Sequence, residues 1–370
     1  MSRHHDATPS PGRESSRNTY RTPAARTLRP VIAALGAAAL MTACGSGEAN
    51  RSSAPSPAAA PSATSASASA SASASEGTSD SWSGTPTDPK KIPLGDGKVE
   101  QTGAKKGYAW SCRAADGTIG GAQKEGPWID TEAKTWDSTA KVSVQGKHTW
   151  PQADYSESVS GADRVIKSTG LPTHEVTGTF PVQPSDPAYQ YDFNPNTIKQ
   201  KAISYTLPLH PTAAAHPSCL AGQVGILKNG VLLFAGFDGE DRDAVAHETQ
   251  DACDGHPAPT EEYHYHDIPS CLLDATEGKR STLVGYALDG YGIYVERDAK
   301  GNLPTNADLD ECHGRTSTVE WNGKQTRIYH YVATTEFPYT AGCFHGTNKT
   351  PGPTGPPPAQ KAPAAAPTSR

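Results

Sequence analysis

Residues 281–296, STLVGYALDGYGIYVE, contain the pattern that decides the fold. Two apolar runs rich in β-branched and aromatic residues flank Leu288-Asp289-Gly290, which suits a tight hairpin turn, as does Lys228-Asn229-Gly230. Five other segments of this kind, separated by Gly, Pro, Asn and Asp, predict further strands: 140–150, 174–182, 198–209, 222–236 and 326–334. The best helix candidate is short, 241–253. The expected fold is therefore mainly β, an antiparallel sandwich or barrel-like domain with one or two short helices, with α+β as the alternative class.

The N-terminal residues 1–43 have the features of a bacterial secretory signal. Arginine-rich polar sequence precedes an apolar run of about a dozen residues, which is too short to span a bilayer as a mature helix. The run ends in Leu40-Met41-Thr42-Ala43-Cys44, which resembles a lipobox, although Met41 replaces the usual Leu. We therefore expect Cys44 to be lipidated and to anchor the protein at the outer face of the cell membrane. A plainly cleaved signal peptide is the alternative.

Low-complexity segments lie on both sides of the region that can fold. Residues 44–90 are rich in Ala and Ser, and residues 349–370 are rich in Pro and Ala. Neither segment has a periodic apolar face, so both are expected to be disordered, the first as a tether. The region between them is long enough for a sizeable core. It divides into an N-terminal β-rich part, 91–190, and a second part, 191–348.

The charge of the chain argues against nucleic acid as a partner. The whole chain has a net charge of −6, and removal of residues 1–43, with six arginines against Asp6 and Glu14, changes it to −10. An acidic surface does not favour binding to phosphate backbones. No Gly-rich loop follows a strand and opens a helix, so a nucleotide cofactor is not expected either.

Six cysteines follow Cys44, an even number in a chain predicted to be exported, so three disulfides are expected. No Cys-x-x-C pair is present, which argues against a cysteine zinc site or a thioredoxin-like motif. Six cysteines allow 15 pairings. The pairing that we expect is Cys253 with Cys271, Cys312 with Cys343, and Cys112 with Cys219.

The segment 261–271, EEYHYHDIPSC, alternates tyrosine with histidine. In a strand the two tyrosines lie on one face and His264 and His266 on the other, about 7 Å apart along the strand, so both imidazoles can reach one ion. A second Tyr-His-Tyr surrounds His330. Neutral imidazole is a frequent ligand of zinc and copper. The candidate ligands are His264, His266 and His330, followed by His256 and His345.

Core packing is the alternative interpretation of these histidines, with their ring nitrogens bonded to backbone carbonyls. If the histidines bind a metal, we expect neighbouring side chains to surround them and to form their hydrogen bonds with groups outside the site. These neighbours are Tyr263, Tyr265, Tyr329 and Asp289.

Several separated motifs, in order from Asn229 to Gly346, resemble the YHYH-domain family: NGVLLFAG, AHETQDACDGHP, EEYHYHDIPSCL, LVGYALDGYGIYVERDAKGNL, DLDECHGR and YHYVATTEFPYTAGCFHG. The resemblance implies that residues 191–348 form a YHYH domain and that the protein is secreted or bound to the bacterial surface. The biochemistry of the family is undefined. Two positions depart from its pattern. Residues 291–295 lack the Pro and final Gly often found there, and Val332 replaces a His, which removes one candidate ligand.

The sequence leaves enzymatic activity open. The segment 247–251, HETQD, is a near miss to the zincin helix, with Asp251 in place of the second His and Glu248 as a potential base. Neither a nucleophile elbow nor a free catalytic cysteine is expected. Copper or zinc binding, with or without metal-dependent hydrolysis or oxidation, is the first hypothesis. The second is an envelope adhesion or carbohydrate-binding module, whose stacking faces are Tyr263, Tyr265, Tyr291, Tyr294 and Trp321.

Overall fold

A computed structural model of the chain describes residues 81–347, apart from 116–120 and 174–175. The expected signal peptide, Cys44, most of the tether and the C-terminal tail lie outside the described residues. Within the described part, no helix has the length and apolar character needed to cross a membrane.

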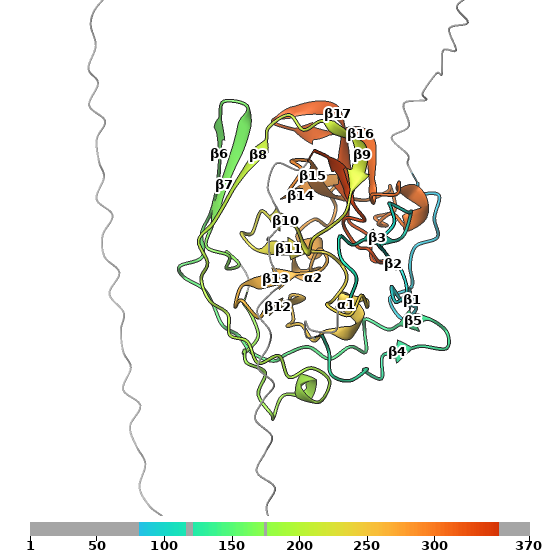
Figure 1. Cartoon of the computed structure of the whole chain (residues 1–370), viewed down its shortest axis with the longest axis vertical. Helices are drawn as coiled ribbons and strands as arrows, with labels where there is room; N and C mark the ends of the chain where they lie inside the picture. The colour runs from blue at the N-terminus through green and yellow to red at the C-terminus, as the bar shows by residue number, and fades with distance from the viewer. Residues whose placement is uncertain (1–80, 116–120, 174–175, 348–370) are drawn as a thin grey trace, which may run out of the picture. The chain divides into compact units, whose positions relative to one another are not determined.

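Eight strands form a central mixed sheet (Figure 1). Neighbouring strands are antiparallel except in two parallel pairs. The hairpins predicted within 222–236 and 281–296 are both present, and each supplies two adjacent strands. Across the sheet the strands are β12 (Gly255–Pro257), β13 (Tyr263–Tyr265), β11 (Leu232–Phe234), β10 (Gln223–Leu227), β14 (Ser281–Ala287), β15 (Gly292–Glu296), β17 (Lys324–Val332) and β16 (Gly314–Trp321).

The remaining elements are short. An antiparallel three-stranded sheet contains β6 (Tyr155–Ser160), β7 (Asp163–Ser168) and β8 (Ile203–Pro208). The other strands are β1 (Ile92–Pro93), β4 (Ile129–Asp130), β5 (Thr135–Trp136), β2 (Val99–Glu100), β3 (Ala109–Trp110), β9 (Ala213–Ser218) and β18 (Phe344–Gly346). The helices are α1 (Ala244–His247), α2 (Ser270–Asp274), and the 3-10 turns η1 (Pro187–Gln190) and η2 (Asn306–Asp308). The mainly β prediction with short helices is confirmed, but the sheets do not close into a barrel.

Two predicted strands are wrong. Residues 140–150 and the described part of 174–182 form only isolated bridges, between His148 and Thr177 and between Val144 and Asp251. Gly146 bends the first segment so closely over the second that a Cβ at this position would lie 2.4 Å from the amide nitrogen of Thr179. Backbone hydrogen bonds join His148 to Thr177 and Thr179 to Gln145, so the two segments run beside each other without forming a continuous ladder.

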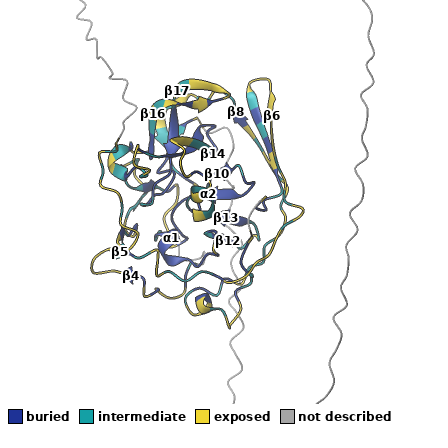
Figure 2. Ribbon diagram, turned by 180° about the vertical axis from the view of Figure 1, so that it is seen from behind, coloured by how far each residue is buried: buried dark blue, intermediate teal, exposed yellow. Residues whose placement is uncertain are grey.

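One hydrophobic core joins the N-terminal part to the central sheet. Side chains from β1, β4 and β5 pack in the same buried cluster as those of the central sheet, and the buried regions of the ribbon run through both (Figure 2). The N-terminal members of this cluster include Ile92, Leu94, Trp128, Ile129 and Trp136. The expected boundary between 190 and 191 therefore does not separate two cores.

The folded part also begins before the expected boundary at residue 91. Trp82 donates from its indole nitrogen to the carbonyl of Asn302, 2.9 Å away, and the hydroxyl of Ser83 donates to Asp308. Both contacts join residues assigned to the tether to the region around η2. The folded part therefore includes residues 82 and 83, although the low-complexity composition before them predicts a tether up to residue 90.

Three disulfides link the chain in the expected pairing: Cys112 with Cys219, Cys253 with Cys271, and Cys312 with Cys343. The first joins the N-terminal part to the segment before β10. Each of the other two closes a loop that contains an outer pair of strands of the central sheet, β12–β13 or β16–β17.

Candidate metal centre

Three histidines converge at the edge of the central sheet formed by β12 and β13. The antiparallel register places His256 directly opposite His264, and His266 follows two residues later on the same face. One ring nitrogen from each lies within 4.8 Å of the other two. All three side chains are buried, with 4%, 4% and 5% of their surface exposed. The prediction that His264 and His266 share a face therefore agrees with the structure.

Backbone hydrogen bonds determine how the rings of His264 and His266 are oriented. The Nδ1 of His266 lies 2.6 Å from the carbonyl oxygen of Ala235, and the Nδ1 of His264 lies 3.4 Å from that of Glu262. A carbonyl only accepts, so each Nδ1 carries a proton, and each neutral ring presents the lone pair of Nε2. The two Nε2 atoms are 3.1 Å apart. Two lone pairs at this distance repel each other unless a cation or a proton lies between them.

Glu248 contributes a fourth donor to this group. Its Oε2 lies 3.1 Å from the Nε2 of His266 and 3.4 Å from the Nε2 of His256. It is buried, with 7% exposed. Neither its Oε2 nor either ring nitrogen of His256 has a hydrogen-bond partner among the described residues. The group therefore consists of three imidazoles close to one another and one carboxylate oxygen beside two of them.

Glu248 reaches this point because helix α1 ends just before it. Asp243 caps the helix by accepting from the amide of Ala246, and Glu248 itself has extended backbone geometry. The near-zincin motif thus does not lie on one continuous helix. His247 instead pairs with Asp96 at 2.9 Å, and Asp251 accepts a hydrogen bond from Tyr263 at 2.8 Å. Of the three zincin-like positions, only the predicted base lies at the histidine group.

The segment around Glu248 is held by contacts from distant parts of the chain. The amide of Thr249 donates to the buried Asp192, and the amide of Gly178 donates to Asp251, 2.9 Å away. The half-buried side chain of Lys141 donates to the side chain of Gln250 at 2.6 Å. These contacts fix the backbone on both sides of Glu248, so its carboxylate is positioned by residues that precede the central sheet.

The electrostatics of the group favour neutral histidines that can bind a cation. Burial lowers the pKa of His256 and of His264 well below the ordinary value for histidine, because an isolated charge is poorly solvated there. Burial also acts to lower the pKa of His266, but the nearby carboxylate of Glu248 outweighs this effect and raises the pKa. A proton on His266 is therefore the natural competitor of a metal ion at this point.

Three of the separations between donor atoms fit a small transition-metal ion. Ligands about 2.1 Å from an ion, at angles between square and tetrahedral, lie roughly 3.0–3.4 Å from each other. The three close donor separations of 3.1, 3.1 and 3.4 Å fall in this range. Imidazole and carboxylate donors without a thiolate suit Zn²⁺ or Cu²⁺. The residues present therefore fit the expected metal.

His330 and His345 do not join the group, contrary to the expectation that His330 would be a third ligand. His330 lies on β17, five strand positions from β13, which is roughly 24 Å at about 4.8 Å per strand. Its Nε2 faces Glu296 at 3.3 Å. The imidazole of His345 stacks on Tyr329, with ring centroids 3.6 Å apart. His256, a reserve candidate, occupies the place expected for His330.

The tyrosines lie on the opposite face of β13 from the histidines and bond away from the site. Tyr263 donates to Asp251, and the hydroxyl of Tyr265 accepts from the side-chain amide of Asn229 at 3.0 Å. Tyr329 and Asp289, also expected near the ligands, lie in the other half of the sheet. All five proposed stacking residues are buried, with at most 4% exposed: Tyr263, Tyr265, Tyr291, Tyr294 and Trp321. They offer no face to a carbohydrate.

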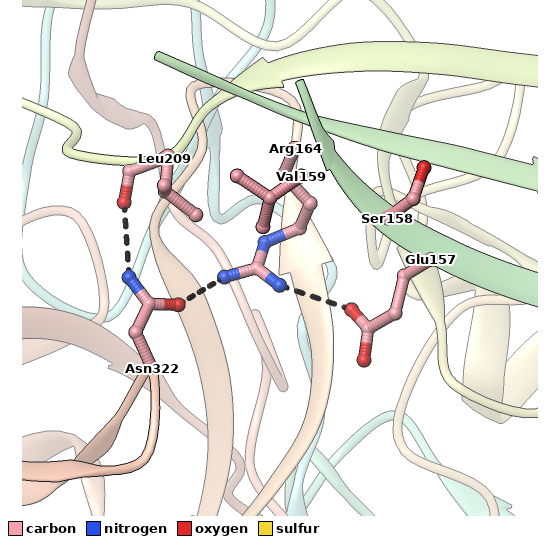
Figure 3. Close-up of a pocket in the computed structure, with 6 residues that line it drawn as sticks. All are labelled: Glu157, Ser158, Val159, Arg164, Leu209 and Asn322. Carbon is pink, nitrogen blue, oxygen red and sulfur yellow. Dashed lines mark hydrogen bonds and ion pairs between the residues drawn. The ribbon is translucent and has the colours of Figure 1, made fainter. Parts of the chain in front are cut away.

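A separate surface pocket of about 320 Å³ lies between the β6–β7 hairpin and the β16–β17 turn (Figure 3). The guanidinium of Arg164 crosses it and bonds to Glu157 on one side and to Asn322 on the other. Because its main cation already has both partners, the pocket presents no free charged group. None of the residues that line it belongs to the histidine group.

Comparisons with known proteins identify one family. Residues 204–305 match the family described as YHYH protein. This range includes Glu248 and the three converging histidines, whereas His330 and His345 lie beyond it. No curated protein and no solved structure matches the chain. By the family match, and in agreement with the order of its motifs, the chain contains a YHYH domain.

Proposed function

We propose that this protein binds one Zn²⁺ or Cu²⁺ ion through His256, His264, His266 and Glu248. The observation that carries the proposal is the convergence of three buried imidazoles, whose ring nitrogens lie within 4.8 Å of one another, with a carboxylate oxygen of Glu248 3.1 Å from His266 and 3.4 Å from His256. Buried polar groups are normally paired, and unpaired ones are costly. A divalent ion satisfies all four donors together and removes the repulsion between the lone pairs.

The donor set favours metal retention over metal catalysis. Structural zinc sites have four protein ligands, whereas catalytic sites keep one position for water or substrate. Three imidazoles and Glu248 supply four protein donors, and each is at least nine-tenths buried. The proposed role of the ion is therefore to stabilise this edge of the domain or to be sequestered there.

The proposed location is outside the cytoplasm, with the chain anchored through lipid on Cys44. The three disulfides support an oxidising compartment. The apolar run and Leu40–Cys44 support lipidation. In the native host, Cys44→Ser should shift the protein from the membrane fraction to the soluble fraction or leave an unprocessed precursor. Unchanged membrane association and processing, measured by fractionation and mass spectrometry, would contradict the anchor.

The metal site is tested by replacing its ligands. The wild-type protein, stripped with chelator and dialysed against Zn²⁺ or Cu²⁺, should retain one ion per chain and melt at a higher temperature than the metal-free protein. His264→Ala and His266→Ala should each weaken binding by 100-fold or more, because one lost ligand leaves the ion with an incomplete shell.

His330→Ala is the matched control. It removes an equally buried histidine from the same kind of Tyr-His-Tyr strand, outside the donor group, and should leave metal affinity unchanged. The histidines have a packing role alone if the wild-type protein retains neither ion and its melting temperature does not change when chelator is added.

A further inference from the structure

The central sheet consists of two halves with the same strand arrangement. From the middle outward, the first half-sheet is β10, β11, β13, β12 and the second half-sheet is β14, β15, β17, β16. In both, the inner pair is an antiparallel hairpin, the next pair is parallel and the outer pair is antiparallel. Where the halves meet, Gly225 pairs with Ala287 and Leu227 with Gly285. Exchange of the two halves preserves this pairing, so an approximate twofold axis passes between Ile226 and Tyr286, which face each other on the two strands.

The two inner hairpins agree residue by residue. Each has one irregularity in its register, before Gly225 in one and before Gly285 in the other. In each turn a side chain accepts from the amide two residues later, Asn229 from that of Val231 and Asp289 from that of Tyr291. Each of these side chains also bonds a tyrosine on the next strand, as the pairs Asn229–Tyr265 and Asp289–Tyr331. The corresponding tyrosines end the two Tyr-His-Tyr motifs.

The outer strands agree as well. Tyr263 donates to Asp251 in the first half-sheet, and Tyr329 donates to Asp310 in the second. Each aspartate also accepts from the amide of a cysteine two residues later. These cysteines form the equivalent disulfides, Cys253–Cys271 and Cys312–Cys343. This many matching contacts indicates an internal repeat.

The repeat assigns a counterpart to every histidine of the metal site. His330 corresponds to His264, because both are the middle residue of Tyr-His-Tyr and both place Nδ1 near the carbonyl oxygen two residues earlier. Arg315, opposite His330, corresponds to His256, opposite His264. Val332 corresponds to His266. The second half-sheet therefore keeps one of the three histidines.

The charges at this second position balance without a metal. Glu296, at the end of β15, places one carboxylate oxygen 3.3 Å from the Nε2 of His330 and the other 3.8 Å from the guanidinium of Arg315. The guanidinium also lies 5.0 Å from the ring centroid of Trp82, which covers it. The side chain of Glu296 is only 9% exposed, so its charge needs a nearby cation.

We propose that the second half-sheet is a repeat copy of the metal-binding half, in which the guanidinium of Arg315 takes the place of the ion. The proposal rests on the proposed metal site of the first half-sheet. It predicts that the second site binds no metal in the natural chain and that two substitutions restore metal binding. Histidine at positions 315 and 332 would complete a set of three histidines beside Glu296.

The test is a metal count on the mature chain carrying Arg315→His and Val332→His. After dialysis against Zn²⁺, two ions per chain are expected, against one for the wild type. Arg327→His with Val332→His is the matched control, because it adds the same number of histidines to the same hairpin while leaving Arg315 in place. It should bind one ion. A count for the double variant equal to that of the control would overturn the proposal.

The same pair of substitutions in a chain that also carries His264→Ala and His266→Ala separates the two sites. One ion is expected with the substitutions and none without them. If the wild type binds no zinc but this fourfold variant binds one ion, the first site is refuted and the repeat is supported. No ion in the fourfold variant would refute the restored site, whatever the wild type binds.

Melting temperatures measured without metal test the proposal even if the double variant does not fold. Arg315→Met removes the guanidinium that balances the charge of Glu296, so the melting temperature should fall by several degrees. Adding Glu296→Gln should recover at least half of this loss, because no unpaired carboxylate then remains buried. Equal melting temperatures with and without Glu296→Gln in the Arg315→Met chain would show that the guanidinium does not replace an ion.

Discussion

At the scale of single residues, His313 links stability to pH. It is 1% exposed, its Nε2 lies 3.0 Å from the hydroxyl of Thr334, and burial lowers its pKa to about 3. In the unfolded chain the pKa of histidine is about 6.5. Between these two values the unfolded chain binds a proton that the folded chain does not. The neutral His313 therefore contributes its full stability above pH 6.5, and this contribution falls as the pH decreases towards 3.

The prediction concerns His313→Asn, since asparagine tolerates the positive φ of 68° at this position. Lowering the pH from 7 to 5 should destabilise the wild type by about 2 kcal/mol more than the variant, at roughly 1.4 kcal/mol per unit of pH below 6.5. Denaturant unfolding at both pH values measures the difference. The same pH dependence in both proteins would mean that His313 is not kept neutral by the fold.

The residues of the site could be predicted from the sequence only in part. His264 and His266 follow from strand alternation alone, because the period of two places them on one face. His256 was only a reserve candidate, because its approach depends on the hairpin register of β12 with β13. His330 was preferred on the basis of its motif, but a repeated motif in a repeated fold lies at the equivalent position of the other half. Glu248 was named only as a base, because tertiary contacts rather than local pattern carry it to the histidines.

At the scale of elements, the loop closed by Cys253–Cys271 contains all three histidine ligands. Replacing both cysteines with serine should lower the free energy of unfolding by about 3 kcal/mol, as expected for a closed loop of this length. It should also weaken zinc binding, because the open loop must be ordered when the ion binds. Denaturant unfolding and zinc titration of the apo protein measure the two effects.

Cys312–Cys343 supplies the matched control, because it closes the equivalent loop in the second half-sheet. Replacing this pair with serine should cost a similar free energy of unfolding and leave zinc affinity close to that of the wild type. Equal losses of zinc affinity in the two disulfide variants would show that general destabilisation, rather than ordering of the ligand loop, controls binding.

At the scale of elements, prediction succeeded where strands pair within a hairpin and failed where the chain is irregular. The pairs β10–β11 and β14–β15 consist of apolar runs joined by an Asn-Gly or Asp-Gly turn, so the strand pattern and the turn predict the same hairpin. Residues 140–150 have a similar local pattern. Their conformation depends on the close crossing at Gly146 and on contacts with the segment before β12, neither of which is encoded locally.

At the scale of the whole molecule, the N-terminal part and the YHYH domain depend on each other. Asp96 pairs with His247, the indole of Trp128 donates to the carbonyl of Ala246 at 2.8 Å, and Lys141 bonds to Gln250. These three contacts bracket Glu248 on both sides. The part of the chain that precedes the matched family region therefore orders a proposed metal ligand within that region.

The last prediction compares fragment 191–347, carrying Cys219→Ser, with fragment 81–347. The shorter fragment loses the buried apolar side chains of β1, β4 and β5, each contributing about 1.5–3 kcal/mol, which together approach the roughly 5–15 kcal/mol total stability of a typical domain. It should lack a cooperative thermal transition and bind zinc at least 10-fold more weakly, since the contacts of Asp96, Trp128 and Lys141 on both sides of Glu248 are then lost. Calorimetry and zinc titration measure both effects. A cooperative transition at the same temperature, with unchanged zinc affinity, would show that residues 191–347 fold and form the site alone.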